Sequence, residues 1–284
     1  MKTDFCKPGT LSEALSCLEK YEDRAVVVNG GTDIVAKIAS YEVDPEMIVY
    51  IQKVGALREI REDDNYLMIG GAVTYRDILE SPLCAKYSGL IQSIGEVGSP
   101  SIRNVGTPAG NIANGAPAAD CGVMLLALEA DVVLASTRGE RTATLDEILL
   151  EPFKTTIKRD ELIKAIRVPR LSPDTCTAFV KMYRRKAQDI ARVSVGVSLN
   201  LEGTVCKDIC IALGAVNKVP VRARSLENLL VGQEMTEGLA AIKDVFPAEA
   251  TPRKNYKKLV TNPVIGRAIR KAYAMAKAGG DNIG

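Results

Sequence analysis

The chain has 284 residues, of which 46% are hydrophobic and 25% are charged, and its formal net charge is +2. This length and hydrophobic content suit a globular protein of two domains with a substantial core. The small positive charge argues against a nucleic-acid-binding protein. The longest apolar stretch is far below the ~18 residues of a membrane-spanning helix, and the N-terminus has no signal-peptide pattern. We therefore expect a cytoplasmic protein with no nucleic-acid partner and no membrane span.

The chain contains no histidine. It therefore lacks the commonest general base and metal ligand, and a Ser-His-Asp or Cys-His nucleophile is excluded. The seven cysteines include no C-x-x-C pair, which argues against a disulfide framework and against a zinc or iron–sulfur site. The closest two, Cys206 and Cys210, are expected to be buried thiols on one face of a strand. We predict no metal site and no catalytic side chain.

The N-terminal part predicts a helix, a strand and a second helix around a glycine turn. Residues 10–21 carry leucines at helical spacing, and residues 25–28 form a β-branched run typical of a strand. After the turn at 29–31, Thr32 and Asp33 can cap a following helix. This layout binds phosphate, because backbone N–H groups and a helix N-terminus supply partial positive charge. Taken alone, the segment also fits an ordinary turn and cap, since neither G-x-G-x-x-G nor G-x-x-x-x-G-K-[ST] is present.

A second glycine-rich segment follows further predicted elements. Strands are predicted at 47–51, 66–69 and 131–135, and helices at 72–80, 83–97 and 145–149. Residues 103–114 are too rich in glycine and asparagine for a strand or helix, and we predict a loop. A helix is predicted from about Pro117 to Ala127, with Asp120 in its first turn. Asp120 either complements the helix dipole or accepts hydrogen bonds from ligand hydroxyls. Both glycine segments suit an anion such as a dinucleotide pyrophosphate.

The C-terminal part begins after residues 169–174, which contain two prolines and are predicted to form a linker. Antiparallel strands are predicted at 177–183, 193–201 and 205–214, helices at 226–230, 236–245 and 256–276, and a disordered tail at 279–284. A basic cluster lies at the start of this part and comprises Lys181, Arg184, Arg185 and Lys186. It is either a solvated face or a contact for a phosphate or a partner, with Asp189 pairing with one of its arginines.

The glycine segments and several later stretches resemble one known family. Residues 29–33 (Asn-Gly-Gly-Thr-Asp) are similar to its A-G-G-T-D segment, and residues 101–112 resemble its I-R-N-x-G-T-x-G-G-N. Further matches are 116–120 with 125–128 (A-x-P-x-x-D and L-L-A-L), 179–185 with 189–191 (F-x-K-x-x-R-R and D-I-A), and 214–222 (G-x-V…P-x-R). The family is the FAD-binding medium subunit of molybdenum hydroxylases, such as xanthine dehydrogenase and carbon monoxide dehydrogenase. The similarity runs from about residue 5 to about residue 232.

The resemblance implies an α+β fold of two domains. The first, residues 1–172, would be a two-lobed FAD-binding domain of the vanillyl-alcohol-oxidase (PCMH) type, with lobes of about 1–58 and 59–172. The second, residues 173–284, would be a smaller α+β domain with an antiparallel sheet. FAD would be bound non-covalently, because the chain lacks the histidine to which flavin is usually attached.

The resemblance also implies the residues that contact FAD. Two loops would wrap the pyrophosphate and the ribityl chain: Val27, Val28, Asn29, Gly30, Gly31, Thr32, Asp33 and Ile34 in the first, and Gly106, Thr107, Pro108, Ala109, Gly110 and Asn111 in the second. Asp120 would bind ribityl or ribose hydroxyls, Ile163 would line the adenine side, and Lys181 would reach the cofactor from the second domain. Ala109 replaces a glycine of the family pattern, so a position that can need a positive φ carries a Cβ.

The resemblance implies an oxidoreductase subunit. It would accept electrons from an iron–sulfur small subunit, beside a molybdenum-cofactor large subunit, and pass them through FAD to NAD or another acceptor. Two alternatives are a flavin-binding scaffold that mainly supports assembly, and a stand-alone flavin oxidoreductase that works without partners.

Overall fold

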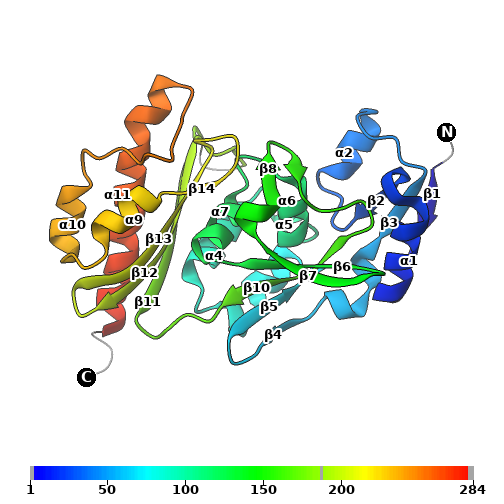
Figure 1. The fold of residues 1–284 in the computed structure, drawn as a ribbon, viewed down its shortest axis with the longest axis horizontal. Coiled ribbons are helices and arrows are strands. Elements are labelled where there is room, and N and C mark those ends of the chain that lie inside the picture. Colours follow the sequence, from blue (N-terminus) through cyan, green and yellow to red (C-terminus); the bar gives the residue numbers. More distant parts are fainter. Residues whose placement is uncertain (1–2, 186–187, 281–284) are drawn as a thin grey trace.

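The computed structural model describes residues 3–185 and 188–280, and its three main sheets follow one another along the molecule (Figure 1). The N-terminal sheet has three strands, the central sheet five and the C-terminal sheet four. Helices accompany each sheet, which confirms the predicted α+β class. Within the described residues, no helix combines the length and apolarity needed to cross a membrane.

The first lobe is a parallel sheet in the order β1-β3-β2 with a helix packed on it. Its elements are β1 (Asp4–Cys6), α1 (Leu11–Tyr21), β2 (Ala25–Val28), α2 (Ile34–Ala39) and β3 (Met47–Tyr50). The hydroxyl of Thr10 caps α1 by accepting from the amide of Glu13 at 3.2 Å. Leu15 and Leu18 of α1 share a buried cluster with Val49 of β3. The first predicted helix and the first two predicted strands are therefore confirmed.

The central lobe is built on an antiparallel sheet in the order β4-β5-β10-β6-β7. Its strands are β4 (Ile60–Glu62), β5 (Tyr66–Gly70), β6 (Asp131–Ser136), β7 (Gly139–Thr144) and β10 (Leu162–Pro169), with a separate hairpin of β8 (Leu149–Glu151) and β9 (Lys154–Thr155). Its helices are α3 (Tyr75–Glu80), α4 (Ser88–Gly95), α5 (Pro100–Arg103), α6 (Pro108–Asn114), α7 (Asp120–Ala127) and α8 (Leu145–Ile148). Every residue of α7 is buried, so this helix is the centre of the molecule.

The loop predicted at 103–114 is largely helical, and that prediction is wrong. Two short helices, α5 and α6, occupy most of the segment. Each starts at a proline that follows a hydroxyl residue. Ser99 accepts from the amide of Ile102 at 3.3 Å, and Thr107 accepts from the amide of Gly110 at 3.0 Å. A hydroxyl cap followed by proline is a strong helix start, and it outweighs the low helix propensity of the glycine and asparagine residues.

The C-terminal part is an antiparallel sheet in the order β11-β12-β13-β14 between helices. Its elements are β11 (Thr175–Met182), β12 (Val193–Glu202), β13 (Val205–Gly214), β14 (Val221–Arg222), α9 (Arg224–Leu230), α10 (Met235–Ala241) and α11 (Asn255–Gly280). One face of the sheet packs on α11, and the other packs on α4 and α7 (Figure 1). The three predicted strands and three predicted helices are confirmed, with boundaries shifted by a few residues.

Two smaller predictions in this part need correction. Cys206 and Cys210 are buried free thiols as expected, but they do not share a face. The register of β12 and β13 shifts at Leu201, where a bulge adds a residue to β13. Cys206 therefore joins the cluster beneath α11, while Cys210 does not. The tail was expected to be disordered from residue 279, yet α11 continues to Gly280; residues 281–284 lie outside the described part.

Candidate cofactor-binding site

A cleft of about 380 Å³ runs between the first lobe and the central lobe. It is formed by the turn from β2 to α2, the segment from α5 to α6, and the start of β10 with the residues before it. Residues predicted to contact FAD that line it are Val27, Asn29, Gly30, Gly31, Thr32, Asp33, Ile34, Gly106, Thr107, Ala109, Gly110, Asn111 and Ile163. Four predicted contacts do not line it, namely Val28, Pro108, Asp120 and Lys181. The fold thus brings both glycine segments to one cleft.

The two glycine segments touch through their backbones. A Cβ on Gly30 would lie 2.0 Å from the carbonyl oxygen of Val105 and 2.9 Å from the Cα of Gly106. Both distances are too short for a Cβ atom, so only glycine fits at this position. The next residue, Gly31, has a φ of +71°, a conformation that favours glycine. Both glycines are therefore required by the geometry. Ala109, in contrast, lies inside α6 and its φ is not positive, so its Cβ is accommodated without strain.

Asn29 joins the lobes at the bottom of the cleft. Its Nδ2 donates to the carbonyl of Gly71 at 2.5 Å and to Oγ1 of Thr107 at 3.0 Å. Its Oδ1 accepts from Nε2 of Gln52 at 2.7 Å, and Gln52 also donates to the carbonyl of Ala72 at 3.2 Å. We call Asn29, Gln52, Gly71 and Thr107 the floor of the cleft. The oxygen and the nitrogen of the Asn29 side-chain amide both have protein partners, so the floor is complete without a ligand.

Sequence reasoning found two of the four floor residues. It named Asn29 and Thr107 as FAD contacts, but it did not identify their partners Gln52 and Gly71. A Cβ on Gly71 would lie 2.0 Å from the carbonyl oxygen of Ile163, so this glycine is required by a close approach to the cleft's far wall. The Gly-Gly pair at 70–71 was a visible signal, because a glycine pair at the end of a strand often marks such an approach.

Asp33 does not cap α2 through its side chain, which corrects the predicted cap. The backbone of Asp33 occupies the N-cap position, but its carboxylate makes no capping hydrogen bond. Instead, Oδ1 accepts from Nδ2 of Asn114, at the end of α6, at 3.2 Å. The side chain of Asp33 therefore links the two lobes and does not stabilise its own helix.

Asp120 and Lys181 form a buried ion pair between α7 and β11. Nζ of Lys181 lies 2.6 Å from Oδ2 of Asp120 and also donates to the carbonyl of Glu96 at 3.2 Å. The two side chains are 4% and 7% exposed. Burial raises the pKa of Asp120 to about 6, although the charge of Lys181 opposes the shift. We call this pair the seam.

The seam leaves one polar atom unsatisfied. Oδ1 of Asp120 is buried and has no hydrogen-bond partner among the described residues, and neither has the hydroxyl of Ser194, which is paired with Lys181 in the strand register. A buried acceptor without a partner costs about 1–3 kcal/mol and is rare in folded proteins. A ligand hydroxyl is a suitable donor for such an oxygen, and a tight glycine turn suits a diphosphate. The glycine turns therefore fit the diphosphate of a cofactor, whereas Asp120 lies outside the cleft lining and its contact with a hydroxyl of the same cofactor stays a prediction.

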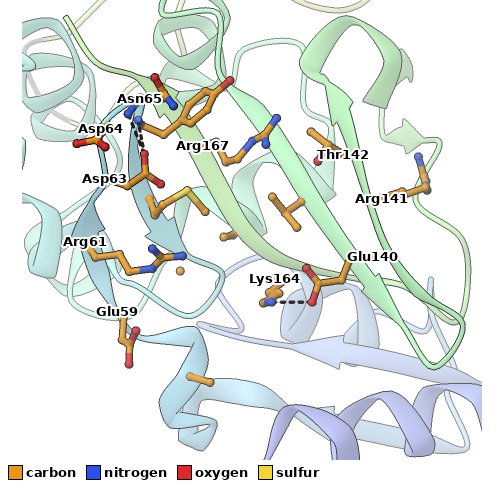
Figure 2. Close-up of a pocket in the computed structure, with 16 residues that line it drawn as sticks. Glu59, Arg61, Asp63, Asp64, Asn65, Glu140, Arg141, Thr142, Lys164 and Arg167 are labelled. Carbon is orange, nitrogen blue, oxygen red and sulfur yellow. Dashed lines mark hydrogen bonds and ion pairs between the residues drawn. The ribbon is translucent and has the colours of Figure 1, made fainter.

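A larger concavity, of about 590 Å³, lies on the outer face of the central sheet (Figure 2). Its walls carry charged side chains, and Lys164 pairs there with Glu140 at 2.6 Å. The guanidinium of Arg167 lies over the ring of Tyr66, with 4.7 Å between its Cζ and the ring centroid. Neither glycine segment contributes a residue to its lining. The smaller cleft is therefore the candidate site.

The predicted basic cluster is divided by the fold. Lys181 points into the seam, whereas the side chain of Arg184 is exposed. Asp189 accepts from the amides of Arg184 and Arg185 at 2.8 and 3.3 Å, and its carboxylate lies 3.9 Å from Nε of Arg184. The predicted pairing of Asp189 is confirmed. Lys186 lies outside the described residues.

The fold and the glycine-lined cleft are those of a two-lobed protein with a candidate site for a nucleotide cofactor. Residues 1–171 match the FAD binding domain in molybdopterin dehydrogenase, and residues 178–272 match the CO dehydrogenase flavoprotein C-terminal domain. The chain is 30% identical to the nicotinate dehydrogenase FAD-subunit of Eubacterium barkeri, covering 90% of each chain. It is 28% identical to the carbon monoxide dehydrogenase medium chain of Hydrogenophaga pseudoflava, covering 95% of this chain and 97% of that one.

A solved structure shows the same fold. Reconstituted CO dehydrogenase from Oligotropha carboxidovorans contains a chain that matches with a TM-score of 0.91 and 26% identity, covering 96% of this chain and 98% of that chain. The chain belongs to the FAD-binding flavoprotein family of molybdopterin dehydrogenases, and its cofactor is FAD. The resemblance, the oxidoreductase class and the cofactor predicted from the sequence are confirmed. The individual FAD contacts stay predictions.

Proposed function

We propose that this chain is the electron-transfer subunit of a molybdenum hydroxylase. It accepts electrons from an iron–sulfur subunit, beside a molybdenum-cofactor subunit, and passes them through FAD to NAD or another acceptor. Support comes from relatives described as an FAD-subunit of nicotinate dehydrogenase and a medium chain of carbon monoxide dehydrogenase. The single observation that carries the proposal is the contact of both glycine segments at Gly30, inside one cleft.

We place the diphosphate of FAD where the two glycine segments meet. Turn residues Gly30 and Gly31 would approach it from one side, and Thr107 and Gly110 from the other, because small residues let backbone amides reach an anion. The adenine end would lie toward Ile163. FAD supplies hydride and single-electron chemistry, while the protein binds and orients it. The cytoplasm is the proposed location.

At the seam, we assign the cofactor contact to Asp120 and a positioning role to Lys181. Oδ2 of Asp120 is occupied by Nζ of Lys181, whereas Oδ1 is free to accept from a ribityl or ribose hydroxyl. The ammonium group of Lys181 lowers the pKa of Asp120 against the effect of burial, so it favours the ionised acceptor. Lys181 would therefore act on the cofactor through Asp120.

The function is tested by titrating the purified chain with FAD and by isolating it with its partner subunits. We expect FAD uptake, co-purification with an iron–sulfur chain and a molybdenum chain, and flavin reduction by the substrate of the complex followed by reoxidation by NAD or another acceptor. Equal electron transfer with FAD removed would support the scaffold alternative. Substrate turnover by the chain alone would support a stand-alone oxidoreductase. Failure to take up FAD would reject the placement of the cofactor.

A further inference from the structure

Three segments meet across the cleft, away from its floor. Nζ of Lys37, on α2, donates to Oδ1 of Asn114, the last residue of α6, at 2.8 Å. The same Nζ lies 5.3 Å from the ring centroid of Phe153, in the turn between β8 and β9. The amide of Asn114 also donates to Asp33 at 3.2 Å. All four residues line the cleft.

Phe153 occupies a position that packing does not explain. It is 59% exposed, and its φ is +61°, in the left-handed region that a residue with a Cβ rarely adopts. Its backbone N–H donates to the carbonyl of Gly115 at 2.9 Å, which holds the hairpin turn against the end of α6. An exposed aromatic residue in a strained conformation, directed at a cation on the opposite lobe, indicates a functional constraint.

Helix α2 and the floor of the cleft differ in how freely they can move. Helix α2 buries none of its residues, so it can shift without opening the core. The floor, in contrast, is tied to backbone carbonyls and to the contact of Gly30 with Val105. The lobes can therefore separate at the exposed side of the cleft while they remain joined at the floor.

We propose that Lys37, Asn114 and Phe153 form a clasp that closes over bound FAD and sets the rate at which the cofactor leaves. The inference rests on the proposed placement of FAD in this cleft. Lys37 contributes a positive charge to a cleft that would hold a diphosphate, and its contacts with Asn114 and Phe153 keep that charge in place across both lobes. Opening the clasp breaks these side-chain contacts and the hydrogen bond from Asn114 to Asp33.

The test is the rate of FAD release from the loaded full chain, followed by the recovery of flavin fluorescence after dilution. We expect Lys37→Met to raise the rate about tenfold, since a hydrogen bond and a charge are lost. Phe153→Gly is expected to raise it about threefold, through loss of the cation–π contact. The double variant is expected to match Lys37→Met alone, because both substitutions remove the same cation–π contact.

Matched controls lie on the same hairpin. Lys154→Met removes a 70% exposed cation that does not line the cleft, and Leu150→Ala removes a 58% exposed apolar side chain; both are expected to leave the release rate unchanged. Phe153→Gly relieves the strained φ, so the thermal midpoint of the FAD-free chain is expected to stay level or rise. Unchanged release in Lys37→Met, or equal acceleration in Lys154→Met, overturns the clasp alone. Absence of FAD uptake by the wild-type chain overturns the clasp together with the placement of FAD.

Discussion

The floor of the cleft and the seam are both polar connections, but only one of them is complete. At the floor, Asn29 uses its oxygen and its nitrogen on protein partners. At the seam, Asp120 uses one oxygen on Lys181 and leaves the other buried without a partner in the described part of the chain. The floor is therefore complete within the fold, and we propose that the cofactor supplies the missing partner at the seam. Changes at the floor should therefore affect folding first, and changes at the seam should affect FAD binding first.

The largest expected effect comes from Gly30→Ala, where the floor adjoins the proposed diphosphate site. The added Cβ would meet the Val105 carbonyl at 2.0 Å, so the two segments must separate. We expect FAD affinity to fall roughly a hundredfold or more, with a lower thermal midpoint. The measurement is FAD titration by fluorescence. Gly55→Ala is the control, because a Cβ there meets nothing within 4 Å. A tenfold change in affinity corresponds to about 1.4 kcal/mol, so an affinity within about twofold of wild type would mean that the added Cβ hardly disturbs the cofactor. That result would place the diphosphate elsewhere.

At the seam, Asp120→Asn tests the unsatisfied oxygen. The substitution keeps the shape of the side chain and an acceptor for Lys181, but it removes the charge. We expect FAD affinity to fall about ten- to a hundredfold, because a hydrogen bond to a charged group is lost. Isothermal titration with FAD measures the change. If the affinity is unaltered, Asp120 is not a cofactor contact and the seam is purely structural.

Asn29→Ala tests the floor of the cleft, where we expect an effect on stability and not primarily on FAD binding. Three hydrogen bonds of the floor are lost, and the free energy of unfolding of the FAD-free chain should fall by about 2–3 kcal/mol. Denaturant unfolding monitored by circular dichroism measures this. The control is Asn65→Ala, at an exposed turn position, with an expected change within about 0.5 kcal/mol. If Asn29→Ala lowered the free energy of unfolding only when FAD is present, the floor would not be complete without the cofactor.

The smallest expected effect is on the pH dependence. The pKa of Asp120 is about 6, above its ordinary value of 3.8, so its contribution to the stability of the FAD-free chain is full below about pH 4 and is lost as the pH rises to about 6. The wild type should lose stability relative to Asp120→Asn over this interval. FAD affinity should rise a few-fold over the same interval, since the carboxylate becomes the better acceptor. Thermal midpoints and FAD titrations at successive pH values measure both.

Lys181→Met sharpens the pH test. Without the ammonium group, which lowers the pKa of Asp120, the midpoint of the FAD-affinity profile should move to higher pH. A purely structural lysine would weaken FAD binding equally at every pH. A profile that is flat in both proteins would show that the ionisation of Asp120 does not matter to the cofactor.

The sequence revealed the first glycine segment well because its signals are local. The β-branched run at 25–28, the glycines and the following apolar helix are contiguous, and the structure forms them at those positions. Asp120 was also placed correctly in the first turn of its helix. What each side chain contacts was less accessible. Asn29 bonds to Gly71, 42 positions away, and Asp120 pairs with Lys181, 61 positions away.

The errors have identifiable causes. The α6 helix was missed because glycine and asparagine content was given more weight than the Thr-Pro start at 107–108. The faces of Cys206 and Cys210 were wrong because a bulge in β13 changes the alternation of side chains, and a bulge depends on the partner strand. The Phe153 conformation has no sequence signal, since phenylalanine is not a residue that favours a positive φ.

We propose that the two glycine segments enclose one diphosphate, and an experimental structure of the chain with FAD would show whether they do. We expect diphosphate density between Gly30 and Thr107, with a ribityl or ribose hydroxyl on Oδ1 of Asp120. FAD bound elsewhere, for example in the charged concavity around Lys164 on the outer face of the central sheet, would overturn the proposal.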